Sequence, residues 1–326
     1  MSTPRLSLSD GLTARPLRAG DAEAVAALLA AAEPVDHTGD HPDAADLTEL
    51  WVNELVDLEH DGVLVQHRDG TVVGYATTVA PPTFRDAYGV HLQGRVHPDW
   101  RGRGIGRALL AWQLDRGAEL HATRHPEAPA RLTATVYTSQ TSLEALLRRA
   151  GLEQLRWFFH MARPLTGLPD RRVVDGVQLV PFTWDRDEDV RHAHNAAFTD
   201  HYGSSERDVV SWRVMFTGMR AFRPDLSVLA VLDGAVVGYA LAYVHESGAR
   251  VTGARECYFG QIGVVPQARG RGCRRRSSSR RCTRRRRTTA GRPAWRSTAR
   301  TPRARSASTR ASASRPRTPR SPGPAG

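Results

Sequence analysis

Two stretches of the chain share the same alternation of β-branched and polar residues on either side of an Asp-Gly pair. Residues 63–80 read VLVQHRDGTVVGYATTVA, and residues 228–243 read VLAVLDGAVVGYALAY. Apolar runs of this length around an Asp-Gly pair are typical of a β-hairpin with a tight turn. The pattern therefore predicts two hairpins, each with its turn at the Asp-Gly pair.

The segments that flank the two hairpins also repeat. The pentapeptide VVGYA occurs at 72–76 and again at 236–240. Each hairpin is followed by a segment typical of a strand, which ends in V-x-P-x-x-R-G-R-G from Val96 and from Val264. The copies lie 164 and 168 residues apart, a separation that indicates a duplicated domain rather than a short structural repeat.

Hydrophobic periodicity predicts the remaining elements in the same order in both copies. In the first copy we expect a strand at 12–17, helices at 21–32 and 47–58, the hairpin, a strand at 89–96, a long helix after the glycines, a strand at 131–137, a helix at 142–151 and a strand at 154–162. In the second copy we expect a strand at 177–182, helical segments at 187–198 and 205–216, the hairpin, and a strand at 257–265.

The periodicity is interrupted between residues 164 and 175, where Pro, Gly and charged residues replace it. We therefore expect a first domain at 1–164, a truncated second domain at 175–272 and a tail at 273–326. The predicted fold class is α/β (α+β). Each domain would hold a mixed, mostly antiparallel sheet flanked by helices, and the second domain would be incomplete.

The charge of the chain is unevenly distributed. The net charge is +12 over 326 residues, but residues 273–326 hold 18 arginines and no Asp or Glu, which leaves −6 for residues 1–272. No apolar run approaches the roughly 18 residues of a membrane span, and no signal-peptide pattern opens the chain. The three cysteines have neither metal-ligand nor disulfide spacing. We therefore expect a soluble, cytoplasmic protein without a metal site.

The glycine-rich segment R-G-R-G-I-G at residues 101–106 lies between a predicted strand and an apolar helix. Small residues at such a turn let the backbone approach an anion, and the N–H groups of a helix N-terminus stabilise phosphate charge. A nucleotide pyrophosphate is therefore a suitable ligand. A turn of this kind also occurs without any ligand, but here the pattern is present twice, each time after V-x-P and a VVGYA hairpin.

With these features the chain resembles the GNAT family, the GCN5-related N-acetyltransferases, in a tandem arrangement of two GNAT-like domains over most of residues 5–272. Arg101, Gly104 and Gly106 match the family's pyrophosphate motif, Q/R-x-x-G-x-G/A. The resemblance implies acetyl-CoA as the acetyl donor and direct attack on its thioester by the amine of a small molecule, with the protein supplying positioning and proton removal. The CoA-binding residues that it implies in the first domain are Val96, Arg101, Gly102, Arg103, Gly104, Ile105 and Gly106.

The positions that carry acid and base in the family differ in the first domain. Many members have a Glu base on the strand before the turn, whereas the first domain offers Tyr88, His91 and Gln93 instead. His91 is the candidate base, because an imidazole titrates near neutral pH; a histidine that only packs or faces water is the alternative. The family's tyrosine in Y-x-x-x-G-F, which protonates the leaving thiolate, corresponds to Leu147. We therefore expect this domain to bind CoA, while its catalytic competence stays open.

The second domain shows the opposite combination. The expected strand before its turn contains a carboxylate at its start, Glu256, which is the candidate base there; the alternative is a solvated acid at the end of a strand. The residues of its turn implied to bind CoA are Arg269, Gly270 and Gly272. Cys273 and Arg274 then replace the apolar residue and the final Gly or Ala of the motif.

The tail at 273–326 contains no Leu, Ile, Val, Met or Phe, so we expect it to be disordered as written. An Arg-rich arm of this kind could bind nucleic acid through phosphate contacts. The other interpretation is a slip of the reading frame directly after RGRG. The genetic code then permits residues 301–314 to read N-P-T-G-A-L-G-V-Y-A-R-V-G-F, with the family's tyrosine in place of Thr309. We favour the slip, because a selected arm has no reason to encode a helix pattern out of frame.

The sequence thus predicts an acetyl-CoA-dependent N-acetyltransferase that acts on a small-molecule amine, with no membrane partner. The alternative is a non-catalytic acyl-CoA-binding module, which Leu147 and the truncated second domain favour. A nucleic-acid binder is the third hypothesis. The truncation would also leave the strand at 258–265 without a covering helix, so we expect low solubility.

Overall fold

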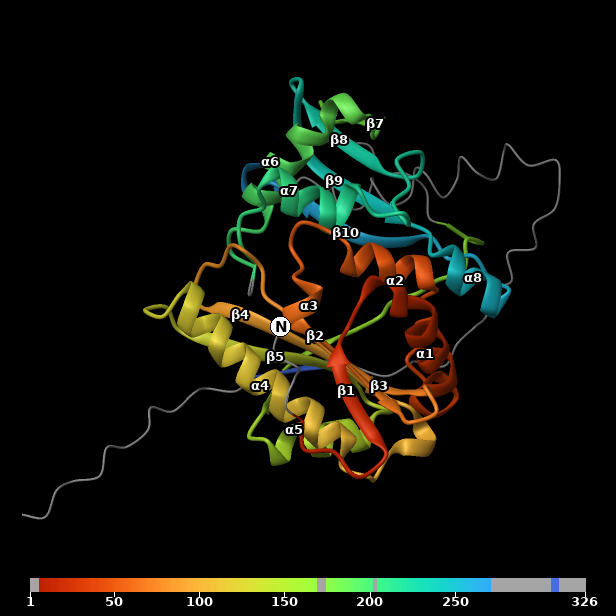
Figure 1. The fold of residues 1–326 in the computed structure, drawn as a ribbon. Coiled ribbons are helices and arrows are strands. Elements are labelled where there is room, and N and C mark those ends of the chain that lie inside the picture. Colours follow the sequence, from red (N-terminus) through yellow and green to blue (C-terminus); the bar gives the residue numbers. More distant parts are fainter. Residues whose placement is uncertain (1–5, 169–173, 202–203, 271–305, 311–326) are drawn as a thin grey trace, which may run out of the picture.

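The strands of the protein form two separate sheets (Figure 1). The computed structural model describes residues 6–168, 174–201 and 204–270, together with the backbone of residues 306–310. One sheet is built mainly from the first half of the chain and the other from the second half. We call these parts the first unit (residues 1–164) and the second unit (residues 175–272).

The first sheet has seven strands in the order β1-β2-β3-β4-β5-β11-β6. They are β1 (Leu12–Pro16), β2 (Gly62–His67), β3 (Val72–Val79), β4 (Tyr88–Val96), β5 (Ala130–Tyr137), β6 (Glu153–Phe158) and β11 (Ser306–Arg310). Neighbouring strands are antiparallel except β4 and β5, which are parallel. A parallel pair needs a crossover connection, and α4 (Ile105–Arg124) provides it.

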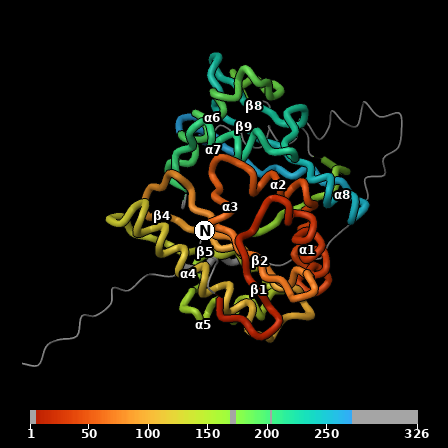
Figure 2. The backbone as a smooth tube through the Cα atoms, in the orientation of Figure 1, coloured from red at the N-terminus to blue at the C-terminus, as the bar shows by residue number. Residues whose placement is uncertain are grey.

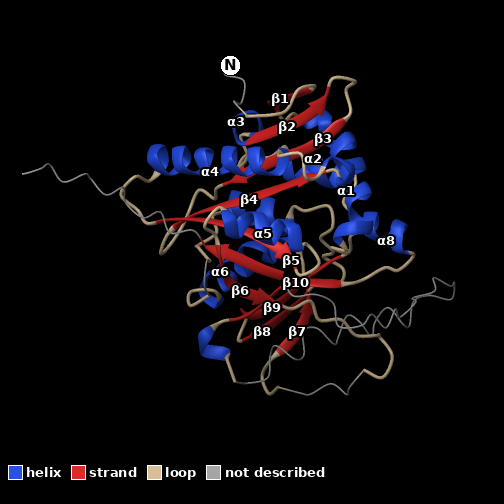
Figure 3. Cartoon of the chain, turned by 90° about the horizontal axis from the view of Figure 1, so that it is seen from below, coloured by secondary structure: helices blue, strands red, loops and turns tan. Residues whose placement is uncertain are grey.

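Helices cover both faces of the first sheet. They are α1 (Ala22–Asp36), α2 (Ala44–Trp51), α3 (Leu58–Asp61), α4 and α5 (Thr141–Arg149). Apolar side chains of α1 and α2 form one core with Leu64 and Tyr75 on one face. Those of α4 and α5 form another core with Val90 and Leu92 on the opposite face. Both α4 and α5 lie in front of the strands in Figure 3.

Two of the predicted helices have different bounds in the structure. The helix expected at 21–32 continues to Asp36 as α1 and includes Pro34 in its last turn. Proline removes a helix hydrogen bond there, but contacts of the neighbouring carboxylates, described below, stabilise this turn. The helix expected at 47–58 is two helices, α2 and α3. Asp43 begins α2 early through a capping box, because its side chain accepts from Asp46 N while Asp46 accepts from Asp43 N.

The second sheet has four antiparallel strands in the order β10-β9-β8-β7. They are β7 (Gln178–Pro181), β8 (Val228–Leu232), β9 (Ala235–Tyr243) and β10 (Tyr258–Val264), and the helices are α6 (Asp187–Ala197), α7 (Val209–Trp212) and α8 (Glu246–Thr252). The helix expected at 205–216 is only α7 followed by a π-helical turn, and α8 has no counterpart among the expected elements. Two sheets flanked by helices confirm the predicted fold class.

The duplicated hairpins are present as β2–β3 and β8–β9. The backbone tube in Figure 2 shows the first in the red-to-yellow half of the molecule and the second in the green-to-blue half. Their turns differ in one detail. Gly70 alone has a positive φ in the first turn, at +89°, whereas Asp233 (+51°) and Gly234 (+82°) share the left-handed region in the second.

Within the tail, the structure differs from the expected disorder at residues 306–310. This segment is the strand β11, which pairs antiparallel with both β5 and β6. A strand in this place satisfies backbone groups on two neighbours at once, a gain that the composition of the segment does not reveal. Residues 271–305 and 311–326, and with them the rest of the predicted tail, lie outside the described residues.

Candidate functional site

The strands β4 and β5 pair along only part of their length. Their parallel register joins Tyr88 to Ala130 and continues to Leu92 and Ala134. From that point β4 continues to Val96 and β5 to Tyr137 with no pairing between them. We call this opening the fork. It leaves the β5-facing edge of residues 93–96 without its strand partner.

A cavity of about 600 Å³ lies at the fork. Its wall is formed by both strands, by the glycine turn and by residues of α1, α2, α4 and α5; among them are Asp36, Leu47, Leu50, His91, Gln93, Arg95, Val96, Arg101, Gly102, Gly104, Gly106, Gln113, Tyr137 and Leu147. The Gln113 amide donates to Gln93 O at 2.7 Å and to Thr77 O at 2.8 Å. This side chain therefore ties α4 to β3 and β4 next to the cavity.

The glycine turn has the geometry that the sequence predicts. Gly102 has φ +79° and Gly104 has φ +84°, both in the left-handed region that glycine adopts without strain. No atom lies within 4 Å of a Cβ placed on either residue, so the space above the turn is open. Gly104 is the N-cap of α4, whose first N–H groups have no partner within the helix. An anion at this place would meet these N–H groups and the positive end of the helix dipole.

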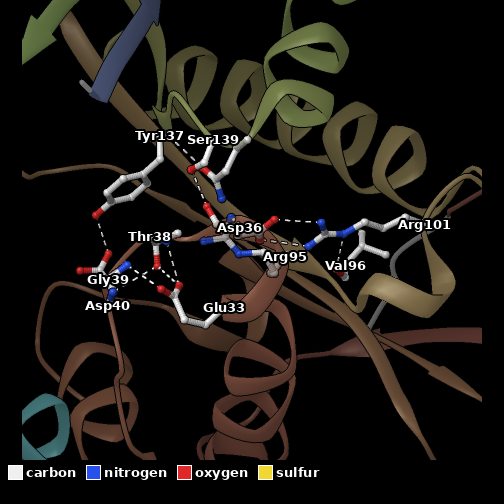
Figure 4. Close-up of polar contacts among 11 residues, drawn as sticks. Glu33, Asp36, Thr38, Gly39, Asp40, Arg95, Val96, Arg101, Tyr137 and Ser139 are labelled. Atoms are coloured by element: carbon white, nitrogen blue, oxygen red, sulfur yellow. Dashed lines mark hydrogen bonds and ion pairs between the residues drawn. The ribbon is translucent and has the colours of Figure 1, made fainter. Parts of the chain in front are cut away.

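Arg101, expected to contact CoA, uses its guanidinium inside the protein instead (Figure 4). Nε donates to Val96 O at 3.1 Å, and Nη1 and Nη2 donate to the two carboxylate oxygens of Asp36 at 2.8 and 3.0 Å. The Asp36 side chain is only 7% exposed, and Arg95 Nη1 lies 3.5 Å from its Oδ2. The pair therefore joins the end of α1 to the strand that leads into the turn.

The other residues expected at the CoA site fall into two groups. Val96, Gly102, Gly104 and Gly106 line the cavity together with Arg101. Ile105 is instead buried in the core against β2 and β3, and the Arg103 guanidinium stacks on Trp100, 4.5 Å from its ring centre.

His91 lies on β4 and lines the cavity. Its Nδ1 is 3.3 Å from Thr133 Oγ1, and burial lowers the pKa of the imidazole below its usual value. Desolvation disfavours the charged ring, so His91 is neutral at pH 7. The arrangement thus leaves an uncharged nitrogen base in the wall of the cavity.

Leu147 is buried in the core between α5 and β4. Tyr137, at the end of β5, also lines the cavity, and its hydroxyl donates to Asp40 at 2.6 Å. Burial, followed by the charge of Asp40, raises the pKa of Tyr137 above its usual range. Tyr137 therefore keeps its proton and holds the loop after α1 against β5.

The loop after α1 is fixed by a network of polar contacts that Figure 4 shows. The Glu33 carboxylate accepts from Thr38 N, Thr38 Oγ1 and Gly39 N at 2.9, 2.5 and 2.7 Å. The Ser139 hydroxyl donates to Asp36 O. Asp36 and Tyr137 are absent from the expectations above. The apolar β5 pattern places Tyr137 at a strand end, but no sequence signal links Asp36 to an arginine 65 residues away.

In the second unit, Glu256 is exposed and lies in the segment before β10, which begins only at Tyr258. The expected strand containing Glu256 is therefore shorter at this end, because Arg255 next to it bonds back to Glu246 of α8. Arg269 donates from Nε to Val264 O at 3.3 Å and from Nη2 to Ala197 O at 2.9 Å. Gly270 has φ +80°, and Gly272 lies outside the described residues.

The described part of the chain lacks both a membrane-spanning helix and a cluster of metal ligands. No helix in it is both long and apolar enough to cross a membrane. No group of three or more His, Cys, Asp or Glu side chains in it is arranged to hold a metal ion.

A family model described as an acetyltransferase (GNAT) domain matches residues 59–140, which include β4 and the glycine turn. Two similar proteins are the mycothiol acetyltransferases of Frankia casuarinae, 32% identical over 217 residues, and of Parafrankia sp., 30% identical over 240 residues. The first match covers 62% of this chain and 57% of the relative, and the second covers 71% and 69%. This chain thus spans little more than half the length of some curated relatives that it matches.

Two solved structures are similar over nearly the whole chain. A GCN5-related N-acetyltransferase from Sphaerobacter thermophilus has a TM-score of 0.66 at 24% identity and covers 94% of this chain and 96% of its own. A tandem GNAT protein from the clavulanic acid biosynthesis pathway has a TM-score of 0.58 at 21% identity and covers 93% and 99%. At these identities the similarity shows the fold.

Proposed function

The chain belongs to the GNAT family of acetyltransferases, and on that premise we propose that its first unit binds acetyl-CoA at the fork and transfers the acetyl group to the amine of a small molecule. The observation that carries this proposal is the cavity itself. The open glycine turn forms one part of its wall, and the neutral His91 forms another.

The residues at the fork fit the parts of acetyl-CoA. The pyrophosphate would accept from the N–H groups of the turn at 102–106, where Gly102 and Gly104 leave room for close approach. The pantetheine arm, which carries amide groups, would lie along residues 93–96, whose edge facing β5 has no strand partner. When bound, acetyl-CoA supplies the thioester that the amine attacks.

We propose that His91 accepts the proton of the attacking amine. A general base must be unprotonated at the working pH, and burial provides this by lowering the pKa of the ring. If Nδ1 carries the proton that Thr133 Oγ1 accepts, Nε2 is the free nitrogen. Glu256 stays a candidate base for the second unit alone, because it is not among the residues that line this cavity.

One observation favours a second function, binding of acyl-CoA without turnover. Leu147 stands where the family has an acidic tyrosine, and it is buried among apolar side chains. No proton donor for a leaving thiolate is present at that place. In an active first unit, the leaving thiolate would take its proton from solvent or from another side chain.

A binding measurement followed by a turnover measurement separates these functions. Calorimetry with acetyl-CoA should show binding to the full chain and at least tenfold weaker binding to Gly104→Val, because φ +84° is strained for a β-branched residue and the added methyl groups occupy the open space. Equal affinity would remove the turn from the site.

Thiol release should then be followed with a panel of amines. The relatives' names make a mycothiol-type acetyl acceptor the first to assay. Release above the rate of acetyl-CoA hydrolysis supports the transferase, and binding without release supports the acyl-CoA-binding module.

A further inference from the structure

The carboxylates of α2 in the first unit contact residues of the second unit. Arg220 Nη1 lies 2.8 Å from Asp46 and 3.3 Å from Asp43, and its backbone N–H donates to Glu49 at 2.6 Å. Arg250 of α8 donates to Asp43 at 2.5 Å. We call these five residues the α2 ion-pair cluster. All three carboxylates of α2 and its N-cap therefore have partners from the other unit.

Two leucines of α2 line the cavity. Leu47 is buried against the Tyr75 core, whereas Leu50, between Asp43 and Asp46 on the helix surface, is half-exposed. Tyr75 on β3 pairs directly with Arg95 on β4, so the two side chains share the face of the sheet that α1 and α2 cover. His91, four residues before Arg95 on the same strand, shares that face as well. The wall made by α2 therefore belongs to the side of the cavity that carries His91.

The helix α2 depends on its surroundings for its position. It has only eight residues, and a helix of this length is marginal by itself in water. The capping box fixes its first turn, and Leu47 and Trp51 anchor its inner face. Its outer face contacts the second unit through the α2 ion-pair cluster, and α2 and α8 lie near each other in Figure 1.

A second link joins the units at the loop before β4. Thr83 Oγ1 is 3.1 Å from Ser205 Oγ and donates to Glu206 O at 3.0 Å. With this link and the α2 ion-pair cluster, the second unit contacts two separate elements of the first, one on the cavity wall and one next to the strand that carries His91.

We propose that the second unit positions the wall of the acetyl-acceptor subsite, with Arg220 and Arg250 holding α2 as positioning residues. This inference rests on the proposed function for its consequence, the binding of the acetyl acceptor. It gives the second unit a role that does not require a complete glycine turn of its own. Each ion pair is solvent-exposed and would stabilise α2 little by itself. The position of α2 therefore depends on the whole α2 ion-pair cluster.

The test compares the full-length protein with the double variant Arg220→Gln/Arg250→Gln. Amide hydrogen exchange over residues 44–51 should be at least fivefold faster in the double variant. The KM for the acetyl acceptor should rise about fivefold, whereas the Kd for acetyl-CoA should stay within twofold, because the glycine turn is held through Arg101 to Val96 and Asp36 rather than through α2. The KM of the parent protein should also rise between 50 and 500 mM salt, and that of the variant should not.

Arg223→Gln is the matched control. Arg223 lies three residues from Arg220 and pairs with Asp225 of its own unit, so its loss should change neither measurement. Asp46→Asn keeps a side-chain oxygen for the capping box but removes the charge opposite Arg220, and it should move both measurements in the same direction by less.

Unchanged exchange over α2 would overturn the inference whatever the activity. Faster exchange with an unchanged acceptor KM would overturn the role in acceptor binding. Failure of the proposed function would instead appear as absence of acetyl-CoA binding or of thiol release in the parent protein, and the exchange measurement would then still decide whether Arg220 and Arg250 hold α2.

Discussion

The two units use the arginine before the glycine turn in the same way but give it different partners. In both, Nε donates to the carbonyl of the valine that ends the preceding strand, at 3.1 Å for Arg101 and 3.3 Å for Arg269. In the first unit the guanidinium then pairs with the buried Asp36 carboxylate at the end of α1. In the second it donates to Ala197 O, the last residue of α6, and Asp200 is 3.7 Å away and 83% exposed.

This comparison assigns the arginine a structural task. It connects the end of the turn's strand to the end of the first helix of its unit, whether the acceptor is a carboxylate or a backbone carbonyl. Under the proposed function, phosphate would then be bound by the glycines and the N–H groups of the turn rather than by this guanidinium. We therefore expect the two units to lose different amounts of stability when the carboxylate near this arginine is removed.

The largest expected effect is on stability. Asp36→Ala leaves Arg101 and Arg95 without their shared carboxylate, and breaking a buried pair from one side costs about 3 kcal/mol or more. Asp200→Ala removes only an exposed, distant partner and should change the free energy of unfolding by less than about 0.5 kcal/mol. Urea denaturation measures both. An equal decrease in the free energy of unfolding for both variants would contradict the difference between the two arginines.

The next effect concerns acid stability. His194 of α6 is buried, its Nδ1 is 2.7 Å from Tyr239 Oη, and desolvation, together with Arg207 and His201, lowers its pKa to about 4. In the unfolded chain the ring titrates near 6.5. The unfolded state therefore binds the proton first as pH falls, and stability is lost from about pH 6.5 downward, by up to about 3 kcal/mol near pH 4.

Tyr75, which corresponds to Tyr239 in the repeat, contacts Trp51 rather than a histidine. The loss that comes from a histidine at this position therefore belongs to the second unit alone, and His91, whose pKa burial also lowers, adds a separate loss in the first unit. His194→Gln should flatten the difference in stability between pH 6.5 and 4, measured by urea denaturation at each pH. An unchanged slope would exclude His194 as its source.

A third comparison concerns the two candidate bases. His91→Asn should lower kcat about 100-fold, the low end for loss of a general base, whereas Glu256→Gln should change it less than twofold. Because burial lowers the pKa of His91, kcat/KM of the parent protein should be level above about pH 6.5 and fall only at more acidic pH. A larger loss in Glu256→Gln would move the chemistry to the second unit.

The smallest expected effect comes from substituting the equivalent glycines of the two turns. Gly102 and Gly270 have φ of +79° and +80°, and neither has an atom within 4 Å of an added Cβ. Alanine at either position should therefore destabilise the protein by about 1 kcal/mol through backbone strain alone. Only Gly102→Ala should also weaken acetyl-CoA binding in calorimetry, and a loss of affinity in Gly270→Ala would place a ligand at the second turn.

The hairpins and the glycine turn could be predicted because their signals are local. An Asp-Gly pair between β-branched runs or a glycine with positive φ before a helix is encoded within a few residues. The extension of α1 to Asp36 could not be predicted, because Pro34 argues locally for an earlier end and the compensating partner, Arg101, is distant in sequence. The same holds for α2, whose outer partners Arg220 and Arg250 are more than 170 residues away.

The candidate site divides in the same way. The turn residues and His91 follow from a motif and a strand pattern. Arg101 matched the motif, yet its guanidinium is held by Asp36, and Ile105 is a core residue, which a motif does not distinguish from a ligand contact. Tyr137 and the fork itself depend on where β4 and β5 stop pairing, and that is a property of the whole sheet.

The fork has a consequence for how such a protein tolerates mutation. A bound ligand whose amides pair with residues 93–96 is recognised by main-chain atoms, which every amino acid except proline provides alike. Donor recognition then places little constraint on side-chain identity along that edge. Under the proposed function, substitutions in the walls around this edge can change the acetyl acceptor while binding of the donor persists, which is the condition under which one scaffold diversifies into many specificities after a gene is duplicated.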